Sequence, residues 1–392
     1  MKSLLFLILF TFPIAFLAQT NLTVTNGSKN LGKGRARRAN VWADPNPSNT
    51  VFDRWTGDTA LVEDIYSAST FVNPLSKNIS LTATYKPAQS WQLTEEAING
   101  VDVLYYIPQN RVGIIFRLHG TGGSAQSTLS SVESRQFSND AVAAGFGIIA
   151  LDSVDRTSGE WSLGPPPNNP DIANVQAVIT NFVNRGIITS SDPLFAQGTS
   201  RGGIFSSLVV YYLNFRADAI YIAYGANLIM PQTTVPTIFC MAANDDQSMV
   251  GQPGNQNAYT QAVNLRDRGI IASYNLHQPS PVYPERFWRI ANLSAEDSHA
   301  IYNALKNNGF LDGRDFLIQN PRDSNWQSVI PAQYLPYSTG ISSVLGAAYA
   351  NHGFYSDYNS RVLRFFSDAL ITSTRPNRPP SALSNVINSA LH

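Results

Sequence analysis

A serine with a glycine two residues away on each side, Gly198-x-Ser200-x-Gly202, is the most informative pattern in the chain. It lies between a strand-like run at 194–197 and a stretch with helical character at 202–214. A serine held on a sharp turn between a strand and a helix has an exposed hydroxyl, and glycines at these positions keep other side chains away from it. The pattern predicts that Ser200 is a nucleophile. A glycine-rich turn with a structural serine is the alternative interpretation.

A second glycine-rich turn, His-Gly-Thr-Gly-Gly at residues 119–123, follows the strand-like run 112–118. A loop without bulky side chains can aim backbone N–H groups at an oxygen that becomes negative during acyl transfer. A phosphate-binding loop is the competing interpretation, but the Lys and Ser/Thr of a Walker motif are missing. We therefore interpret this turn as a source of oxyanion donors.

The elements that must position these turns alternate between strands and helices from about residue 101. Strand-like runs occur at 101–107, 112–118, 147–151, 194–197, 219–223, 236–241 and 270–276, and helical stretches at 132–144, 172–184, 202–214 and 258–268. This alternation predicts an α/β fold with a mostly parallel sheet flanked by helices. Several of the strands are almost continuously apolar, as expected when both faces of a sheet are buried.

Over roughly residues 90–370 the sequence resembles the α/β-hydrolase superfamily, through the Ser200 turn and its strand–turn–helix context. The resemblance implies that Ser200 is the nucleophile. It also implies that the backbone N–H of Arg201 is one oxyanion donor and that Gly122 or Gly123 supplies the second.

A carboxylate that orients the base is expected between the serine and the base in this fold. The strand 236–241 is followed by a loop that contains Asp245 and Asp246. Asp245 has the better spacing from the end of the strand, so we prefer it as the acid. Asp246 remains the alternative acid, and both are solvated loop residues if the fold is different.

Three histidines lie between the candidate acid and the C-terminal tail, and we prefer His352 as the base. It lies on a loop directly before an amphipathic helix, which is the usual arrangement in the family that the sequence resembles. His277 follows a short strand, where many family members place the base, so it remains the alternative. His299 opens a helix whose capping box explains its acidic neighbour, and His119 precedes the serine in the chain, so neither is preferred.

Residues 278–345 become an insertion in the hydrolase domain (87–372) if His352 is the base. The insertion is rich in prolines, contains Trp288 and Trp326, and has one clear helix that starts near residue 294. This composition predicts a helical or irregular unit that forms a lid over the pocket, with surface packing as the alternative. A C-terminal tail at 373–392 follows.

Residues 21–86 are rich in Asn, Thr and Ser, and short runs at 22–24, 39–42 and 79–85 are typical of strands separated by turns. The runs 52–58 and 81–85 resemble a divergent InlB B-type bacterial repeat, which is a small all-β module. Such modules usually serve as spacers or adhesive units beside a functional domain, so we assign no chemistry to this one.

Residues 1–20 have the pattern of a secretory signal peptide: Lys2 is followed by an apolar run to about Leu17. The run is shorter than the roughly 20 residues that a membrane-spanning helix needs, and Pro13 interrupts it. We therefore expect a secreted or periplasmic protein without a transmembrane anchor.

The composition excludes several other classes. The chain has 392 residues, 43% of them hydrophobic and 14% charged, and its 27 Lys+Arg balance its 27 Asp+Glu. A chain without net positive charge lacks the basic character that is typical of nucleic-acid-binding proteins. The single cysteine, Cys240, excludes an internal disulfide and a cysteine-based metal site.

Together these features predict a secreted serine esterase that acts on a small-molecule or polymeric ester through Ser200, His352 and Asp245. No metal or organic cofactor is expected. A serine peptidase of the same fold, and a non-catalytic surface adhesion protein with a hydrolase-like domain, are the alternatives. The acyl and alcohol groups of the substrate and the oligomeric state do not follow from the sequence.

Overall fold

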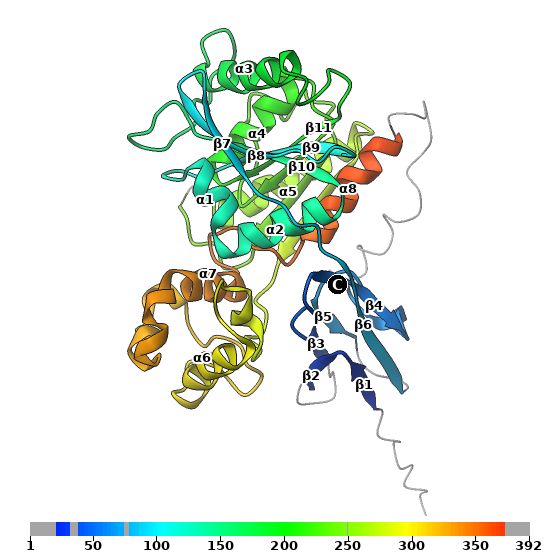
Figure 1. Ribbon diagram of the computed structural model, residues 1–392, viewed down its shortest axis with the longest axis vertical. Coiled ribbons are helices and arrows are strands. Elements are labelled where there is room, and N and C mark those ends of the chain that lie inside the picture. The colour runs from blue at the N-terminus through cyan, green and yellow to red at the C-terminus, as the bar shows by residue number, and fades with distance from the viewer. Residues whose placement is uncertain (1–20, 32–37, 74–77, 249, 373–392) are drawn as a thin grey trace, which may run out of the picture.

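The computed structural model describes residues 21–31, 38–73, 78–248 and 250–372 (Figure 1). The expected signal peptide at 1–20 and the C-terminal tail at 373–392 lie outside the described residues. Within the described part of the chain, no helix has the length and apolar character needed to cross a bilayer.

An eight-stranded sheet forms the centre of the largest unit, with the order β14-β13-β12-β11-β9-β10-β8-β7 (Figure 1). Its strands are β7 (Thr94–Ile98), β8 (Val101–Tyr106), β9 (Gly113–Leu118), β10 (Phe146–Leu151), β11 (Leu194–Thr199), β12 (Ala217–Tyr221), β13 (Thr237–Ala242) and β14 (Ala272–His277). β8 is antiparallel to β7 and β10, and the other neighbours pair in parallel. The predicted mostly parallel sheet is therefore confirmed, and β11 lies in its middle.

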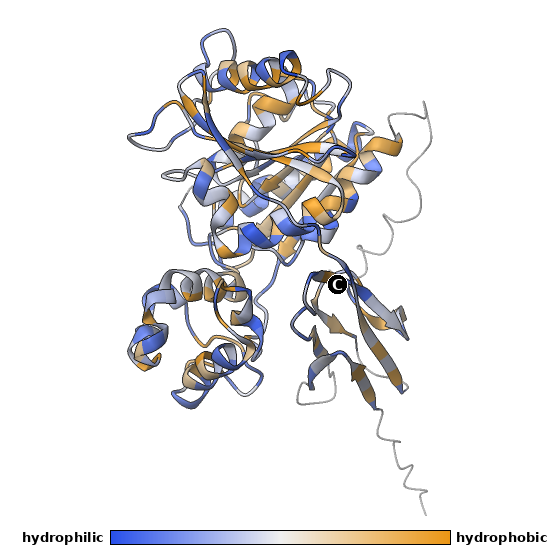
Figure 2. Cartoon of the chain, viewed as in Figure 1, coloured by the Kyte–Doolittle hydropathy of each residue, from blue (hydrophilic) through white to orange (hydrophobic). Residues whose placement is uncertain are grey.

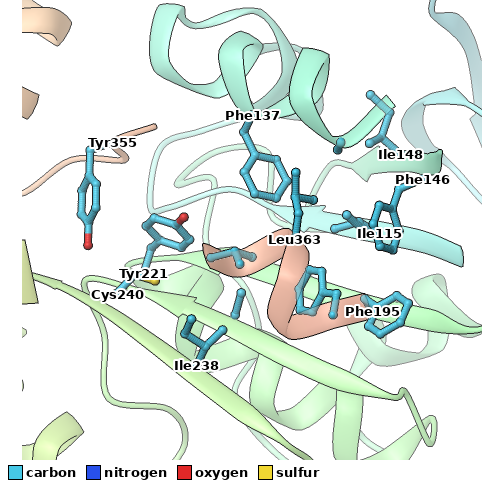
Figure 3. Packing of buried hydrophobic residues seen from close by; sticks show 14 of the residues in the cluster. Ile115, Phe137, Phe146, Ile148, Phe195, Tyr221, Ile238, Cys240, Tyr355 and Leu363 are labelled. Carbon is cyan, nitrogen blue, oxygen red and sulfur yellow. The ribbon is translucent and has the colours of Figure 1, made fainter. Parts of the chain in front are cut away.

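Helices cover both faces of this sheet. One face carries α1 (Ala125–Ser130), α2 (Val132–Ala143) and α8 (Asn359–Thr372), and the other carries α3 (Pro170–Asn184), α4 (Arg201–Tyr212) and α5 (Gln252–Asp267). Successive residues of a strand point to opposite faces, so Ile115 packs on the α2 side while Ile114 packs on the α3 side. Figure 3 shows the first of these layers, and Figure 2 shows that apolar residues are concentrated in and around the sheet. The sheet thus has two buried faces, which explains its continuously apolar strands.

The N-terminal unit is all β, as predicted, and consists of two three-stranded sheets, β1-β6-β4 and β2-β3-β5. Its strands are β1 (Leu22–Thr25), β2 (Gly27–Leu31), β3 (Ala39–Ala43), β4 (Thr50–Gly57), β5 (Ser69–Val72) and β6 (Ile79–Pro87), with a short 3-10 helix, η1 (Thr59–Leu61). Its core is small and is centred on Trp55 and Val41. The indole N–H of Trp55 donates to the carbonyl oxygen of Ser67 at 3.0 Å, so the one polar atom of this buried ring is satisfied.

Between β14 and α8 the chain leaves the sheet and forms a separate helical unit (Figure 1). Its elements are α6 (Ala295–Asn307), α7 (Ser338–Tyr349) and the 3-10 helices η2 (Arg286–Arg289), η3 (Pro321–Asp323), η4 (Trp326–Val329) and η5 (Ala332–Tyr337). Phe287, Trp326 and Val344 are among the residues of its own apolar core. The expected helical and irregular insertion is therefore present, with a second long helix, α7, that leads towards residue 352.

Candidate active site

Ser200 lies at the turn between β11 and α4 with φ 54° and ψ −121°, a conformation that residues other than glycine rarely adopt. Its backbone N–H donates to the carbonyl oxygen of Tyr221 on β12 at 2.9 Å, which ties the turn to the neighbouring strand. A Cβ atom at Gly198 would come within 2.1 Å of the carbonyl oxygen of Gly202. Gly198 is therefore required because its backbone touches that of Gly202. The sharp turn places the side chain of Ser200 at the end of β11.

Replacing Gly202 by alanine is expected to destabilise the fold by at least about 3 kcal/mol, because the added atom would be overpacked against rigid backbone. It would lie 2.3 Å from the carbonyl oxygen of His119 and 2.4 Å from that of Leu118. Gly164→Ala is the matched control, since a Cβ there meets nothing within 4 Å. Thermal unfolding followed by circular dichroism measures both variants. Equal melting temperatures for the two would contradict the close approach at the turn.

His352 lies between Ser200 and Asp245. Its Nε2 is 3.0 Å from Oγ of Ser200, and its Nδ1 is 2.8 Å from Oδ2 of Asp245. Because an ionised carboxylate only accepts hydrogen bonds, Nδ1 carries the proton and Nε2 is free to accept the proton of the serine hydroxyl. Asp245 is buried and its other oxygen accepts the backbone N–H of Gln247 at 3.0 Å, which fixes the carboxylate. The structure thus brings together the three residues that the sequence analysis preferred.

The loops that carry the acid and the histidine are bonded to one another. Asn244, beside Asp245, donates its backbone N–H to the carbonyl oxygen of Ala350 at 2.9 Å and its side-chain N–H to that of Tyr349 at 2.8 Å. Ala350 ends α7 in the left-handed conformation, with φ 60°, and so turns the chain sharply towards His352. These bonds explain how residues 107 positions apart reach hydrogen-bond distance.

A buried carboxylate holds the far side of the histidine loop. Glu133 on α2 accepts the backbone N–H of Ser356 at 3.0 Å and pairs with the guanidinium of Arg289 at 3.0 Å. The same glutamate therefore joins α2, the insertion and the segment that follows His352. Burial of a paired charge is tolerated only when its hydrogen bonds are satisfied, and these contacts satisfy it.

The alternative residues have other partners. Nε2 of His277 is 2.8 Å from the carbonyl oxygen of Ala347, and burial lowers the pKa of this histidine. His299 is half exposed and pairs with Glu285 at 2.9 Å. Asp246 faces solvent next to the preferred acid and pairs with Arg322 at 3.5 Å. Neither alternative base bonds to Ser200, and the bond to His352 is made by Asp245 and not by Asp246.

His119, which precedes the serine in the chain, has a structural environment. It is buried, and burial lowers its pKa. Its Nε2 accepts the backbone N–H of Ser153 at 3.2 Å, and its ring lies 4.5 Å from that of Trp161. These contacts hold the base of the glycine-rich turn 119–123 against its neighbours.

The hydrogen bonds in this turn differ from the expectation that the backbone N–H of Gly122 or Gly123 is free to bind an oxyanion. Gly122 donates to the carbonyl oxygens of Ser158 and Gly159 at 3.1 Å, and Gly123 donates to that of Gly120 at 3.0 Å. Both groups named by the sequence analysis are therefore already engaged. The N–H groups of Thr121 and Arg201 have no acceptor among the described residues. Gly120 packs against the serine, since a Cβ there would lie 3.4 Å from Cβ of Ser200.

A buried arginine supports the strand below the serine. Arg117 on β9 donates to Oε1 of Gln197 at 2.9 Å, and Gln197 in turn donates to Oγ1 of Thr199 at 3.0 Å. The guanidinium also lies 4.7 Å from the centre of the Phe137 ring, and burial lowers its pKa to about 9. These contacts extend from Arg117 through Gln197 to Thr199, the residue before Ser200. Arg117 and Gln197 belong to no motif that sequence analysis recognises.

The insertion contacts the loops of the site through the side chains of Arg322 and Asn320. Arg322 on η3 donates to the carbonyl oxygen of His352 and pairs with Asp246, the neighbour of the acid. Asn320 adds a second contact to Asp246 at 3.3 Å. Arg322 therefore bridges the two loops that carry the acid and the histidine. The sequence analysis missed this residue because an exposed arginine in an irregular segment carries no pattern.

Arg322→Ala is expected to lower kcat about three- to tenfold, equivalent to about 1 kcal/mol, because the histidine loop loses a charged hydrogen bond at an exposed position. KM is expected to change little. Arg314→Ala is the matched control, because Arg314 is an exposed arginine of the same insertion whose ion-pair partner is Asp312. Steady-state kinetics with a small ester measures both variants. A change in KM with an unchanged kcat would contradict a positioning role for Arg322.

The described residues contain no group of three or more His, Cys, Asp or Glu that could hold a metal ion. The arrangement at Ser200 consists of a hydroxyl, an imidazole and a carboxylate. Such a set can perform nucleophilic acyl transfer.

No protein-family model and no curated protein matches the chain. Among solved structures, it is similar to a carboxyl esterase from Bacillus coagulans, with 14% identity, a TM-score of 0.35, and coverage of 48% of this chain and 90% of the other. It is also similar to an acetyl xylan esterase from Aspergillus awamori (14% identity, TM-score 0.36, 46% and 81% coverage). For an acylaminoacyl peptidase from Pyrococcus horikoshii the values are 9% identity, TM-score 0.38, and 62% and 48% coverage. Similarity at this level concerns the fold of about half of the chain and says nothing about its reaction.

Proposed function

We propose that the protein is a secreted serine hydrolase that cleaves carboxylic esters. The observation that carries the proposal is the continuous hydrogen-bonded chain from Ser200 through His352 to Asp245, in which the serine occupies a strained turn. A hydroxyl is a weak nucleophile unless an adjacent base accepts its proton. The arrangement supplies that base and the carboxylate that orients it.

In the proposed acylation step, Oγ of Ser200 attacks the ester carbonyl carbon while Nε2 of His352 takes the hydroxyl proton. Asp245 keeps the imidazole in the required tautomer and stabilises its positive charge. The imidazolium then gives its proton to the leaving alcohol, and an acyl-enzyme remains. Water, activated by the same histidine, attacks the acyl-enzyme, which releases the acid and restores the serine hydroxyl.

For the oxyanion we propose the backbone N–H groups of Arg201 and Thr121. The hydrogen bonds of Gly122 and Gly123 within the described structure argue against the glycines that the sequence analysis chose. The contact between Gly120 and Ser200 supports a position for Thr121 next to the reacting carbonyl. Loss of one such donor usually costs about 3 to 4 kcal/mol of transition-state stabilisation.

The function is tested with the purified chain and three probes: a fluorophosphonate label, short p-nitrophenyl esters and aminoacyl p-nitroanilides. We expect covalent labelling and a higher kcat/KM for the esters than for the anilides. A higher kcat/KM for the anilides would contradict the esterase assignment and favour a serine peptidase of the same fold. If the chain is not labelled and turns over neither substrate class, the result would favour the alternative of a non-catalytic adhesion protein.

The remaining assignments are proposals as well: a signal peptide at 1–20 that directs export, a module at 21–86 resembling the InlB B-type repeat, and a hydrolase domain at 87–372 whose insertion at 278–345 acts as a lid. The link from Arg322 to the histidine loop supports a functional connection between the insertion and the site. Mass spectrometry of the mature N-terminus after expression in a bacterial host tests the cleavage.

A further inference from the structure

Two neighbouring cavities lie where the N-terminal β unit meets α2, the insertion and α8. Their volumes are about 450 Å³ and about 410 Å³. Four residues line both of them: Asn46, Gln136, Trp288 and Arg289. We call the two connected cavities the seam groove.

The seam groove is held open by fixed contacts on both sides. The indole N–H of Trp42 donates to Glu285 at 2.6 Å, and its ring stacks on that of Tyr283 at 5.2 Å. On α8, Arg361 pairs with the buried Asp64 at 2.8 Å. Because these contacts join the β unit to both the insertion and the last helix, the groove is a built feature of the folded chain.

Polar atoms without partners line this groove. Oδ1 of Asn359, Oγ of Ser360 and Nη1 of Arg364 are buried and have no hydrogen-bond partner among the described residues. Asn359 is only 4% exposed and its amide N–H is held by Asp140 at 2.7 Å, which leaves the oxygen as the atom that needs a donor. A buried polar group without a partner costs about 1 to 3 kcal/mol. Asn359, Ser360 and Arg364 all line the first cavity, so these unsatisfied polar groups lie in its wall.

The rest of the lining is rich in uncharged amides. The side chains of Asn46, Asn49, Gln89 and Gln136 are among its lining residues. A primary amide offers two donors and one acceptor oxygen, which matches hydroxyl groups that both donate and accept. Trp288 adds an aromatic face beside these amides, on which the C–H face of a sugar ring can pack.

The charges of the groove do not favour an anion. Arg289 is engaged by Glu133 at 3.0 Å, and Arg364 lies 3.7 Å from the carboxylate of Asp64. On the acidic side, burial and the neighbouring Glu285 raise the pKa of Asp44. Lys86 and Arg135 also line the groove, as do Asp53, Asp140 and Asp357, so its wall carries charges of both signs and neither sign dominates. The groove is therefore neither purely cationic nor apolar, and its chemistry fits an uncharged polar ligand.

From this combination we infer that the seam groove binds a neutral polysaccharide chain. Two cavities that share one tryptophan and two amide side chains fit successive units of an extended chain. The inference does not depend on the proposed hydrolysis, because Ser200, His352 and Asp245 do not line the groove. Arg289 and Ser356 do line it and contact Glu133 beside the histidine loop, so neither is substituted in the test. The N-terminal unit would then hold the enzyme on a polysaccharide surface while the hydrolase unit acts on esters.

The test is affinity gel electrophoresis of the full chain in gels that contain ester-free neutral polysaccharides: xylan, hydroxyethyl cellulose, galactomannan and mixed-linkage β-glucan. We expect retardation by at least one of them. Trp288→Ala and Gln136→Ala are each expected to weaken the apparent affinity about tenfold, through loss of the stacking face and of an amide. Gln176→Ala on α3 is the matched control, since this exposed glutamine lies outside the groove.

Three outcomes would overturn the inference: no retardation in any neutral gel, equal retardation of the wild type and both groove variants, or stronger retardation by the anionic polygalacturonate than by every neutral polymer. Hydrolysis of p-nitrophenyl acetate is measured on the same samples and is expected to be unchanged in the groove variants. Retardation without hydrolysis would refute the proposed esterase alone. Hydrolysis without retardation would refute the seam groove alone.

Discussion

Ser200→Ala is expected to lower kcat/KM for a small ester about 10⁶-fold, because the acyl-enzyme can no longer form. The side chain that is removed is the one whose oxygen lies 3.0 Å from Nε2 of His352. Alanine keeps the Cβ atom, so the turn is expected to remain folded. The measurement combines initial rates with p-nitrophenyl acetate and fluorophosphonate labelling, and melting temperature reports on folding.

Ser191→Ala provides the control for this experiment, because Ser191 is an exposed serine in the loop before β11. It is expected to retain the rate and the labelling of the wild type. If Ser200→Ala is labelled as strongly as the wild type, the nucleophile is another residue and the proposed mechanism is refuted.

Asp245→Asn is expected to lower kcat about 10⁴-fold, because an asparagine amide presents a donor to Nδ1 of His352 and favours the wrong tautomer. Nδ1 of His352 lies 2.8 Å from Oδ2 of Asp245, so the substitution replaces the acceptor of this hydrogen bond by a donor. The overall geometry is expected to be preserved, because the side chain keeps its shape. Initial rates measured with a small ester across a range of pH test the prediction.

Asp246→Asn is the matched control, since it changes the same kind of side chain one position further along. Asp246 faces solvent and pairs with Arg322, not with the histidine. We expect a loss of less than about threefold, in line with the small contribution of exposed ion pairs. A larger loss for Asp246→Asn than for Asp245→Asn would show that the acid is misassigned.

The fold was predictable because its signals are local. The alternation of apolar strands and helical stretches required only the period of each element and the punctuating turns. The helix expected at 132–144 is α2 at Val132–Ala143, and the one expected at 202–214 is α4 at Arg201–Tyr212. The turn at Ser200 was visible in the same way, because the close approach of backbone at Gly198 and Gly202 permits only glycine.

The choice among candidate partners needed more than local signals. The sequence offered two adjacent acids and several histidines, and only burial and hydrogen bonds distinguish them. Asp245 turns inward because its carboxylate is held by Gln247, whereas Asp246 turns out to Arg322. His277 sits at the end of β14, as a base of this fold can, but its nitrogen is bonded to Ala347.

The sequence by itself determined the α/β arrangement and the sharp turn at Ser200, because each depends on residues that are close in the chain. Only the tertiary structure decided which backbone N–H groups remain free, that Arg322 bridges two loops, and that a polar groove forms beside the N-terminal unit. These features arise where segments distant in the chain pack together, and hydrogen bonds across such contacts leave no periodic pattern in the sequence.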